Sequence, residues 1–391
     1  MNKLFEIIEK PLSGEWGNDG EAGKGIPVLR TTNFTNDGVI DYSNVVTRTI
    51  DAKKVKEKYL RSGDIIIEKS GGSPAQPVGR VVLFEGEDNK YLFNNFTSVL
   101  RLRDKNVNSP KYLFYHLFSY YKMGVTRKFQ NKTTGISNLK LDRFIKETEI
   151  TLPPLEEQSE IAKTLDTAAE LLAMRKQQLA ELDNLIKSIF YDMFGNPVTN
   201  DKGWEVRKLG DLFNITSGGT PSTSINSYWG NGNISWIGSN LCQNEILYGN
   251  DGKFITQLGL DNSSAKLFSK GTVLVALVGA TIGKTALLRF QSSTNQNVAG
   301  IEVHKNEDFT SEYVYYAVQS KYYKFLELAN GNFKMANLGF IRNLDIYVPP
   351  LPFQTQFASI VTKIEEQKTL VKKAIDETQY LFDSLMSEYF E

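Results

Sequence analysis

The sequence predicts an α+β fold in which two repeats of one globular α+β domain are joined by two long helices. Three observations lead to this prediction. The second half of the chain repeats the first, short strand-like runs fill the start of each repeat, and a heptad pattern ends each repeat. We expect globular domains at 1–151 and 199–348, and long helices within 152–198 and 349–391.

The repeat is clearest at a Pro-Pro-Leu motif. Residues 152–158 (Leu-Pro-Pro-Leu-Glu-Glu-Gln) recur 196 residues later as 348–354 (Val-Pro-Pro-Leu-Pro-Phe-Gln). Two further pairs lie upstream: 111–115 with 312–316, and 61–67 with 269–275. Because proline is tolerated in the first turn of a helix, the motif indicates a helix start.

Each repeat begins with strand-like runs separated by Gly, Asn and Pro turns, followed by an aromatic helix. The expected strands are 26–29, 64–67, 80–84 and 98–102 in the first repeat, and 234–237, 272–278, 285–290 and 300–303 in the second. The expected aromatic helices are 110–123 and 311–328. We expect their tyrosines and phenylalanines to lie in the core rather than to stack on bases. These are Tyr112, Phe114, Tyr115, Tyr313, Tyr315 and Tyr316.

Each repeat ends with apolar residues at alternating steps of four and three, which is typical of a coiled-coil seam. The first seam is Ile161, Leu165, Ala168, Leu172, Arg175, Leu179, Leu182, Ile186, Ile189 and Met193. The second is Phe357, Val361, Ile364, Lys368, Val371, Ile375, Thr378, Phe382, Leu385 and Tyr389. We favour an antiparallel pair, because it relates the two halves by a pseudo-twofold axis. Two separate amphipathic helices, each lying on its own domain, are the alternative.

Composition excludes several classes of protein. With one cysteine and two histidines, neither a disulfide framework nor a Cys/His zinc site can form. No run approaches the roughly 18 apolar residues of a membrane span, and the first residues do not resemble a signal peptide. We therefore expect a soluble, cytoplasmic protein.

Two stretches look like catalytic motifs but lack the spacing or the residues that those motifs require. Gly279 and Gly283 precede Lys284 as in a phosphate-binding loop, but three residues separate these glycines where four are needed. We expect a turn between strands instead. The Pro-Pro motifs lack the Asn/Asp and the aromatic residue of an adenine methyltransferase. His116 aligns with Ala317, so the repeats cannot share a histidine-based catalytic site, and we expect binding rather than catalysis.

Further motifs occur mainly in the second repeat: Trp204, Lys208-Leu209-Gly210-Asp211, Gly218-Gly219-Thr220-Pro221, Tyr228-Trp229-Gly230, Ile234-Ser235-Trp236-Ile237 and Asn295-Gln296-Asn297. With the Pro-Pro-Leu helix starts, they make the chain resemble the specificity (S) subunit of type I restriction-modification systems over essentially its whole length. The first repeat departs from the pattern, because it lacks the Gly-Gly-Thr-Pro turn and has Asn94-Asn95-Phe96 in place of Asn295-Gln296-Asn297.

The resemblance implies a non-catalytic subunit whose two target-recognition domains each recognise one half of a split DNA sequence, while the helices set the spacer. It also implies that adenine-N6 methylation with S-adenosylmethionine belongs to two methyltransferase (M) subunits. A possible restriction (R) subunit would use ATP and Mg. This chain is expected to bind no cofactor or metal itself. The alternative function is a non-catalytic coiled-coil scaffold that binds proteins rather than DNA.

The charge distribution agrees with DNA binding, although the total of 45 basic and 45 acidic residues gives no such hint. The first domain carries 24 Lys and Arg against 18 Asp and Glu, and the second carries 13 against 12. The helical segments are acidic instead, with 4 against 8 and 4 against 7. Basic domains suit DNA and an acidic rod suits protein partners.

Residues suited to base edges or phosphates gather in loops after the expected strands. In the first domain we expect contacts from Arg30, Thr31, Asn33, Lys69, Ser70, Arg80, Asn95, Arg127, Lys128, Lys132 and Thr133. In the second we expect them from Ser217, Thr220, Ser239, Asn240, Thr281, Lys284, Gln296, Asn297, Lys334 and Asn337. Asn138-Leu139 and Asn337-Leu338 match between the repeats and are equally compatible with a structural role.

Overall fold

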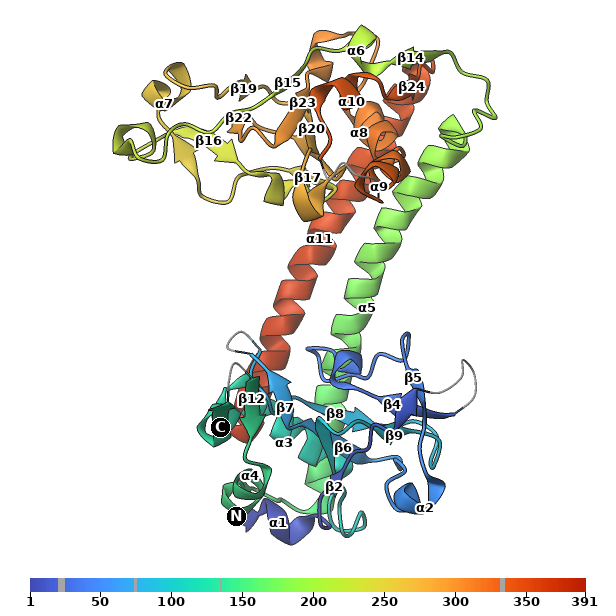
Figure 1. Ribbon diagram of the computed structural model, residues 1–391, viewed down its shortest axis with the longest axis vertical. Helices are drawn as coiled ribbons and strands as arrows, with labels where there is room; N and C mark the ends of the chain where they lie inside the picture. Colours follow the sequence, from blue (N-terminus) through green and yellow to red (C-terminus); the bar gives the residue numbers. More distant parts are fainter. Residues whose placement is uncertain (20–24, 74–75, 134–135, 331–334) are drawn as a thin grey trace. The chain divides into compact units, whose positions relative to one another are not determined.

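The computed structural model describes residues 1–391 except 20–24, 74–75, 134–135 and 331–334 (Figure 1). The chain forms two compact units. The first contains Met1–Lys176 and Ala374–Glu391, and the second contains Gln177–Lys373. Each unit therefore combines a globular α+β domain with one part of each long helix, α5 (Leu155–Phe194) and α11 (Leu351–Phe390). The predicted fold class is confirmed.

Two four-stranded sheets form most of the first domain. One has the order β2 (Leu12–Ser13), β10 (Thr97–Leu100), β6 (Asp64–Glu68) and β8 (Val81–Phe84), all antiparallel. The other has the order β3 (Asn18–Asp19), β5 (Val46–Thr49), β4 (Ile26–Leu29) and β9 (Leu92–Phe93), with β4 and β9 parallel. Smaller sheets are β11 (Gln130–Thr133), β12 (Ile136–Leu139) and β7 (Ser70–Gly72), and the pair β1 (Asn2–Lys3) with β13 (Glu149–Ile150).

The second domain repeats this plan. A five-stranded sheet has the order β15 (Ile215–Ser217), β23 (Val298–Ile301), β20 (Val273–Ala276), β21 (Thr285–Leu288) and β17 (Glu245–Leu247). Its companion has the order β18 (Phe254–Ile255), β16 (Ile234–Ile237), β22 (Ser292–Thr294) and β19 (Leu267–Phe268), with β16 and β22 parallel. The pair β14 (Val206–Lys208) with β24 (Asp345–Tyr347) corresponds to β1 and β13.

Shorter helices complete both domains. The first has α1 (Leu4–Ile7), α2 (Ala52–Val55), α3 (Pro110–Lys122) and α4 (Leu141–Glu147), with 3-10 turns η1 (Thr31–Asn33) and η2 (Val125–Phe129). The second has α6 (Leu209–Leu212), α7 (Gln257–Asp261), α8 (Ser311–Gln319), α9 (Tyr322–Asn330) and α10 (Leu338–Arg342). Its 3-10 turns are η3 (Asn226–Tyr228), η4 (Ser239–Leu241), η5 (Gly279–Thr281) and η6 (Val303–Lys305).

The predicted strands 98–102, 272–278, 285–290 and 300–303 differ from the observed strands by one or more residues at their ends, and one predicted helix is wrong in its extent. The helix expected at 311–328 is two helices, α8 and α9, interrupted at Ser320 and Lys321. The Lys321 side chain is buried, and its Nζ donates to the carbonyl of Pro197 at 2.6 Å. Burial lowers the pKa of Lys321 to about 8. A contact with a residue so distant in sequence could not be inferred from helical periodicity.

The aromatic helices form the core of each domain, as predicted. Tyr112 and Tyr313 are 2% and 1% exposed. Their hydroxyls donate to the carbonyls of Thr151 and Tyr347 at 2.8 and 2.9 Å, just before the long helices. The buried phenols are thereby satisfied, as Tyr requires in a core.

The repeated glutamine of the Pro-Pro-Leu motif fastens each long helix to its domain. Gln158 is 1% exposed, accepts from the Ser109 backbone N–H at 2.9 Å, and donates to the Pro153 carbonyl at 2.8 Å. Gln354 is fully buried and does the same, accepting from Thr310 N–H at 3.0 Å and donating to the Pro349 carbonyl at 2.8 Å. These two donors precede the aromatic helices, so each glutamine ties two helix starts together.

Each aromatic helix forms an ion pair with the residue that follows a neighbouring strand, and the signs of the two charges are exchanged between the units. In the first unit Lys111, on α3, bonds Glu85 at 3.2 Å and Asp166 at 2.6 Å. In the second unit Glu312, at the corresponding position of α8, bonds Arg289 at 2.6 Å. Glu85 and Arg289 each directly follow the corresponding strands β8 and β21, so cation and anion have changed places.

Within each unit the two long helices pack side by side and antiparallel. In the first unit Leu165 of α5 shares a core with Phe382 and Met386 of α11. In the second unit a later part of α5 meets an earlier part of α11, with Phe190 at 5.5 Å from Phe357 between ring centroids. The predicted coiled-coil pairing is confirmed over the alternative of separate helices. No helix in the described ranges is long and apolar enough to cross a membrane.

Two charged seam residues bond the opposite helix, and Lys368 also bonds Glu365 of its own helix. The Arg175 guanidinium donates to the Thr378 hydroxyl and to the Ala374 carbonyl. Lys368 bonds Asp183 at 2.7 Å and Glu365 at 2.6 Å. Polar residues at such positions fix the register of a coiled coil at some cost in stability.

Candidate nucleic-acid interface

Four loops meet at one end of the strands in the second unit. Gly219 N–H donates to the Thr294 carbonyl at 2.8 Å, Asn295 N–H to Ile237 at 3.1 Å, and Leu277 N–H to Asn297 at 2.8 Å. These bonds join 217–220, 238–243, 277–284 and 294–297, which we call loop cluster 2. The structure thus brings together eight predicted residues: Ser217, Thr220, Ser239, Asn240, Thr281, Lys284, Gln296 and Asn297. The cluster contains no Asp or Glu.

Hydrogen bonds within loop cluster 2 fix the positions of several of its polar side chains. The Thr220 hydroxyl donates to Gln296 Oε1 at 2.6 Å. Lys284 Nζ donates to Gln243 Oε1 at 2.7 Å, and Gln243 Nε2 donates to the Asn240 carbonyl at 3.0 Å. Gln243 was missed by the sequence prediction, because only the fold places it beside Lys284. Exposed amides and a cation are the groups that bind base edges and phosphates.

The Gly-Gly turn is required by close approach. A Cβ on Gly218 would collide with the hydroxyl and the carbonyl of Thr294. Trp236 then closes over the turn, and its indole Nε1 donates to the Gly219 carbonyl at 3.1 Å. Trp229 packs edge-on against Trp236, with ring centroids 5.2 Å apart. Trp236 and Trp229 therefore support the loop that carries Thr220.

Equivalent backbone bonds build loop cluster 1 in the first unit, from residues 13–16, 30–35, 68–73, 76–80 and 93–97. Lys69 N–H donates to the Phe96 carbonyl at 2.9 Å, as Leu277 N–H does to Asn297. Lys69 Nζ reaches the Ser13 hydroxyl at 2.5 Å, and burial lowers the pKa of Lys69. The Ser70 hydroxyl donates to Asn138 Oδ1 at 2.5 Å. Asn95 is exposed beside them.

Phe96, which follows Asn95, is a second functional candidate that the sequence prediction missed. Its side chain is 46% exposed at the tip of a turn, beside the polar residues of the cluster. Apolar contact with a thymine methyl group is one form of base recognition. The signal was available, because Phe96 aligns with the polar residue Asn297 of the second repeat.

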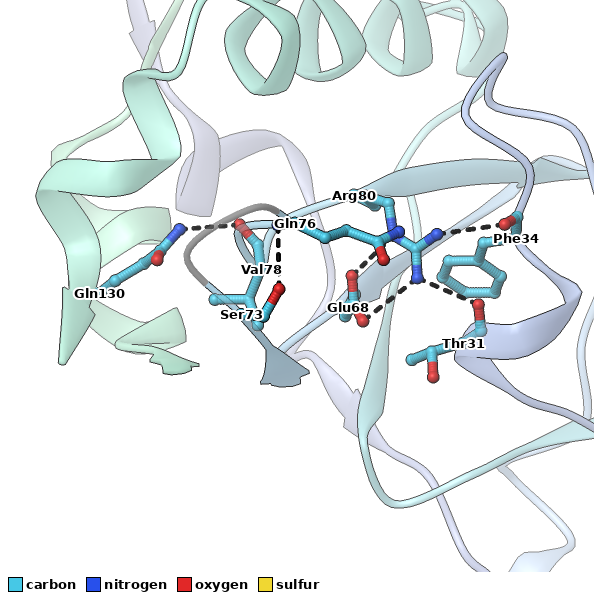
Figure 2. A network of polar contacts seen from close by, with 8 residues as sticks. All are labelled: Thr31, Phe34, Glu68, Ser73, Gln76, Val78, Arg80 and Gln130. Atoms are coloured by element: carbon cyan, nitrogen blue, oxygen red, sulfur yellow. Dashed lines mark hydrogen bonds and ion pairs between the residues drawn. The ribbon is translucent and has the colours of Figure 1, made fainter. Parts of the chain in front are cut away.

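Arg80, one of the predicted DNA contacts, is buried, and its guanidinium is occupied by bonds within the fold (Figure 2). Its Nε donates to Glu68 Oε2 at 2.8 Å, and its Nη1 and Nη2 donate to the carbonyls of Phe34 and Thr31, both at 3.1 Å. Nη2 also bonds Glu68 Oε1 at 3.3 Å. The guanidinium therefore ties the start of β8 to the end of β6 and to turn η1.

Asn33, another predicted DNA contact, is also buried. It is 2% exposed, and its Nδ2 donates to the carbonyls of Asp41 and Asn44 at 2.9 and 3.1 Å. Its Oδ1 accepts from the Arg30 backbone N–H at 2.9 Å. Both ends of the amide are occupied, so Asn33 caps the turn. Arg30, half-buried, points to the Asn44 carbonyl at 3.1 Å.

Asn337 is also structural in this fold. It caps α10, and its Oδ1 accepts from the Phe340 backbone N–H at 2.8 Å. The matching of Asn138 with Asn337 is wrong by two residues, because Lys140 occupies the corresponding cap of α4. Arg127 and Lys128 are exposed on η2, Lys132 and Thr133 lie in β11, and Lys334 lies outside the described residues.

The structure rejects the nucleotide-binding motif. Turn η5 joins β20 to β21, which are antiparallel neighbours, whereas a phosphate-binding loop leads from a strand into a helix. The described residues contain no cluster of three His, Cys, Asp or Glu side chains that could hold a metal ion. Cys242 is buried, and burial raises its pKa to about 12, so the thiol is not activated.

Comparison with known proteins agrees with this geometry. Residues 4–184 and 201–379 match the type I restriction modification DNA specificity domain. The putative type I restriction enzyme MjaX specificity subunit of Methanocaldococcus jannaschii is 25% identical over 399 residues, which cover 96% of this chain and 86% of that protein. The EcoR124I/EcoR124II specificity subunit of Escherichia coli is 26% identical over 216 residues, covering 53% of this chain and 52% of that protein.

A solved structure shares the fold. The S subunit of a type I restriction-modification system from M. genitalium has a TM-score of 0.58 and 17% identity, covering 100% of this chain and 95% of that chain. The two matched segments together span most of the sequence, one in each repeat. This chain belongs to the family of type I restriction-modification DNA specificity subunits.

Proposed function

We propose that this chain is the DNA-recognition subunit of a type I restriction-modification complex, in which each loop cluster recognises one half of a bipartite target. The observation that carries the proposal is the repetition of one exposed polar loop cluster on equivalent strand ends in both units. Direct recognition needs side-chain amides, hydroxyls and cations at base edges, and both clusters present them.

The proposal assigns no reaction to this chain. Methylation of adenine N6 with S-adenosylmethionine would belong to two M subunits, and ATP- and Mg-dependent cleavage to an R subunit where one is present, all in the cytoplasm. The long helices would set the spacer between the half-targets and present an acidic surface to these partners. The excess of basic residues in the first domain supports contact with a polyanion.

The proposed DNA contacts differ from the sequence prediction by five residues, three removed and two added. Arg80, Asn33 and Asn337 are removed because their polar groups already satisfy the fold. Phe96 and Gln243 are added because both border the clusters. The other predicted residues remain proposed contacts.

The experiment is methylome sequencing of host DNA with and without this gene, with the M subunit present and active. We expect one split adenine-methylated motif to disappear on deletion. Exchange of residues 1–151 for those of another specificity subunit should change only one half of that motif. Loss of no motif, or a change in both halves, would contradict the proposal.

A scaffold that binds only proteins makes a different prediction. Binding of the purified assembly to duplex DNA should weaken steeply with salt if Lys and Arg contact phosphates, since counterions are released on binding. A scaffold would show no such binding at any salt concentration.

A further inference from the structure

The two units place corresponding cations in different electrostatic settings. Equivalent backbone bonds show which positions correspond. In the first unit Glu68 N–H donates to the Arg80 carbonyl at 2.8 Å. In the second unit Ala276 N–H donates to the Lys284 carbonyl at 2.9 Å. Arg80 thus corresponds to Lys284, and Glu68 corresponds to Ala276. Both side chains extend to the turn after the neighbouring sheet's parallel strand, Arg80 to Phe34 and Lys284 to Gln243.

The carboxylate that neutralises the cation is present only in the first unit. Glu68 is 3% exposed and binds Arg80 through both oxygens. At the same place the second unit has the methyl group of Ala276, which is fully buried. Lys284 is only half-buried, and its ammonium bonds the neutral amide of Gln243 at 2.7 Å.

The surroundings of Lys284 favour an anion. Loop cluster 2 contains no Asp or Glu, and within it the ammonium bonds the neutral amide of Gln243. Gln243 is itself anchored to the Asn240 carbonyl, which holds the ammonium near the loop surface at low entropic cost. An ammonium of this kind is a point charge suited to phosphate, and it confers no base preference of its own.

We infer that Lys284 is the phosphate anchor of the second unit, made available by the replacement of a carboxylate with Ala276, whereas Arg80 anchors only its own fold. The inference rests on the proposed DNA recognition and adds that different side chains of one loop cluster contact the bases and the phosphates. In loop cluster 2 the amides face base edges, and Lys284 holds the backbone and sets the register.

The test measures binding of the assembled complex to two duplexes across 50 to 200 mM salt. One duplex carries the methylated motif and the other a scrambled sequence. Lys284→Gln should reduce the slope of log affinity against log salt by about one on both duplexes. Lys305→Gln is the matched control, because Lys305 lies on η6 beyond the opposite end of β23 and pairs with Glu302 at 2.7 Å. It should leave the slope unchanged.

A second variant tests the mechanism. Ala276→Glu should recreate the carboxylate of the first unit and capture Lys284, which would lower the slope as Lys284→Gln does. Adding Lys284→Gln to Ala276→Glu should then change nothing further, and Ala276→Gln controls for the added volume. Melting curves show that each variant is folded.

The outcomes separate the inference from the proposed function. An unchanged slope for Lys284→Gln, or additive effects of Ala276→Glu and Lys284→Gln, would overturn the role of Lys284 while wild-type binding stands. A loss of preference for the motif without a change of slope would also overturn it, since a phosphate contact weakens all sequences alike. Failure of the wild-type complex to bind either duplex would contradict the proposed function instead.

Discussion

The two units have the same side-chain hydrogen bonds at the start of each long helix but different ones in the loops where the strands end. Gln158 and Gln354 have the same partners, an N–H before the aromatic helix and a proline carbonyl. Arg80 and Lys284 occupy equivalent positions but have different neighbours. A buried amide must satisfy fixed backbone groups, so the fold allows it little change. A loop side chain is free to acquire a new partner.

The largest expected loss of stability follows substitution of Glu68, the carboxylate that distinguishes the surroundings of Arg80 from those of Lys284. Glu68→Ala would leave the buried Arg80 guanidinium without its carboxylate, which costs about 3–5 kcal/mol. Lys284→Met in the second unit should cost no more than about 0.5 kcal/mol, because it breaks no buried ion pair. Native-state hydrogen exchange measures both, since amides of β6 and β20 report the two units separately. Equal effects would contradict the contrast between the two cations.

A histidine in the first unit predicts a difference in acid stability. His116 is 3% exposed, and burial lowers its pKa to about 4. The unfolded chain, with a pKa near 6.5, binds more protons, so stability rises between pH 4 and 6.5 and is complete above that. The first unit should lose up to about 3 kcal/mol on acidification through this window.

The measurement is unfolding of wild type and His116→Phe at pH 4 and pH 7. The variant should remove most of the extra acid sensitivity, whereas the second unit has Ala317 at this position and supplies the internal control. Retention of the full pH dependence in His116→Phe would assign it to other groups.

The helix starts provide a matched pair of variants. Gln158→Leu and Gln354→Leu would each leave one N–H and two carbonyls, one of them a proline carbonyl, without a side-chain partner, for about 1–3 kcal/mol. We expect the two losses to agree within about 0.5 kcal/mol by denaturant titration. A clear inequality would show that the two fastenings are not energetically equivalent.

The smallest effect is expected at exposed cross-strand ion pairs. Lys3 pairs with Glu149 and Lys208 with Asp345, each at 2.6 Å and at equivalent edges. Substitution of either lysine with alanine should cost less than about 1 kcal/mol, and less again at 1 M salt. A loss larger than that of the glutamine variants would reverse the expected order.

Local sequence pattern was sufficient for the elements whose stabilising contacts are local. Strands 26–29 and 234–237 were predicted with their observed bounds, because a short apolar run between turns determines them. The break at Lys321 depends on Pro197, and the burial of Arg80 depends on Glu68 and two carbonyls at turn η1. Sequence supplied residue types for the site, but only tertiary structure distinguishes a charge that is neutralised from one that is free.

The inverted ion pairs beside the aromatic helices have a consequence for folding. A chain that contains two similar domains risks exchanging an element between them during folding. With α3 on the second domain's sheet, Lys111 would face Arg289, and with α8 on the first, Glu312 would face Glu85. Both wrong dockings oppose like charges, while both correct ones pair opposite charges. The charge at the start of each aromatic helix therefore favours docking on its own domain and disfavours docking on the other.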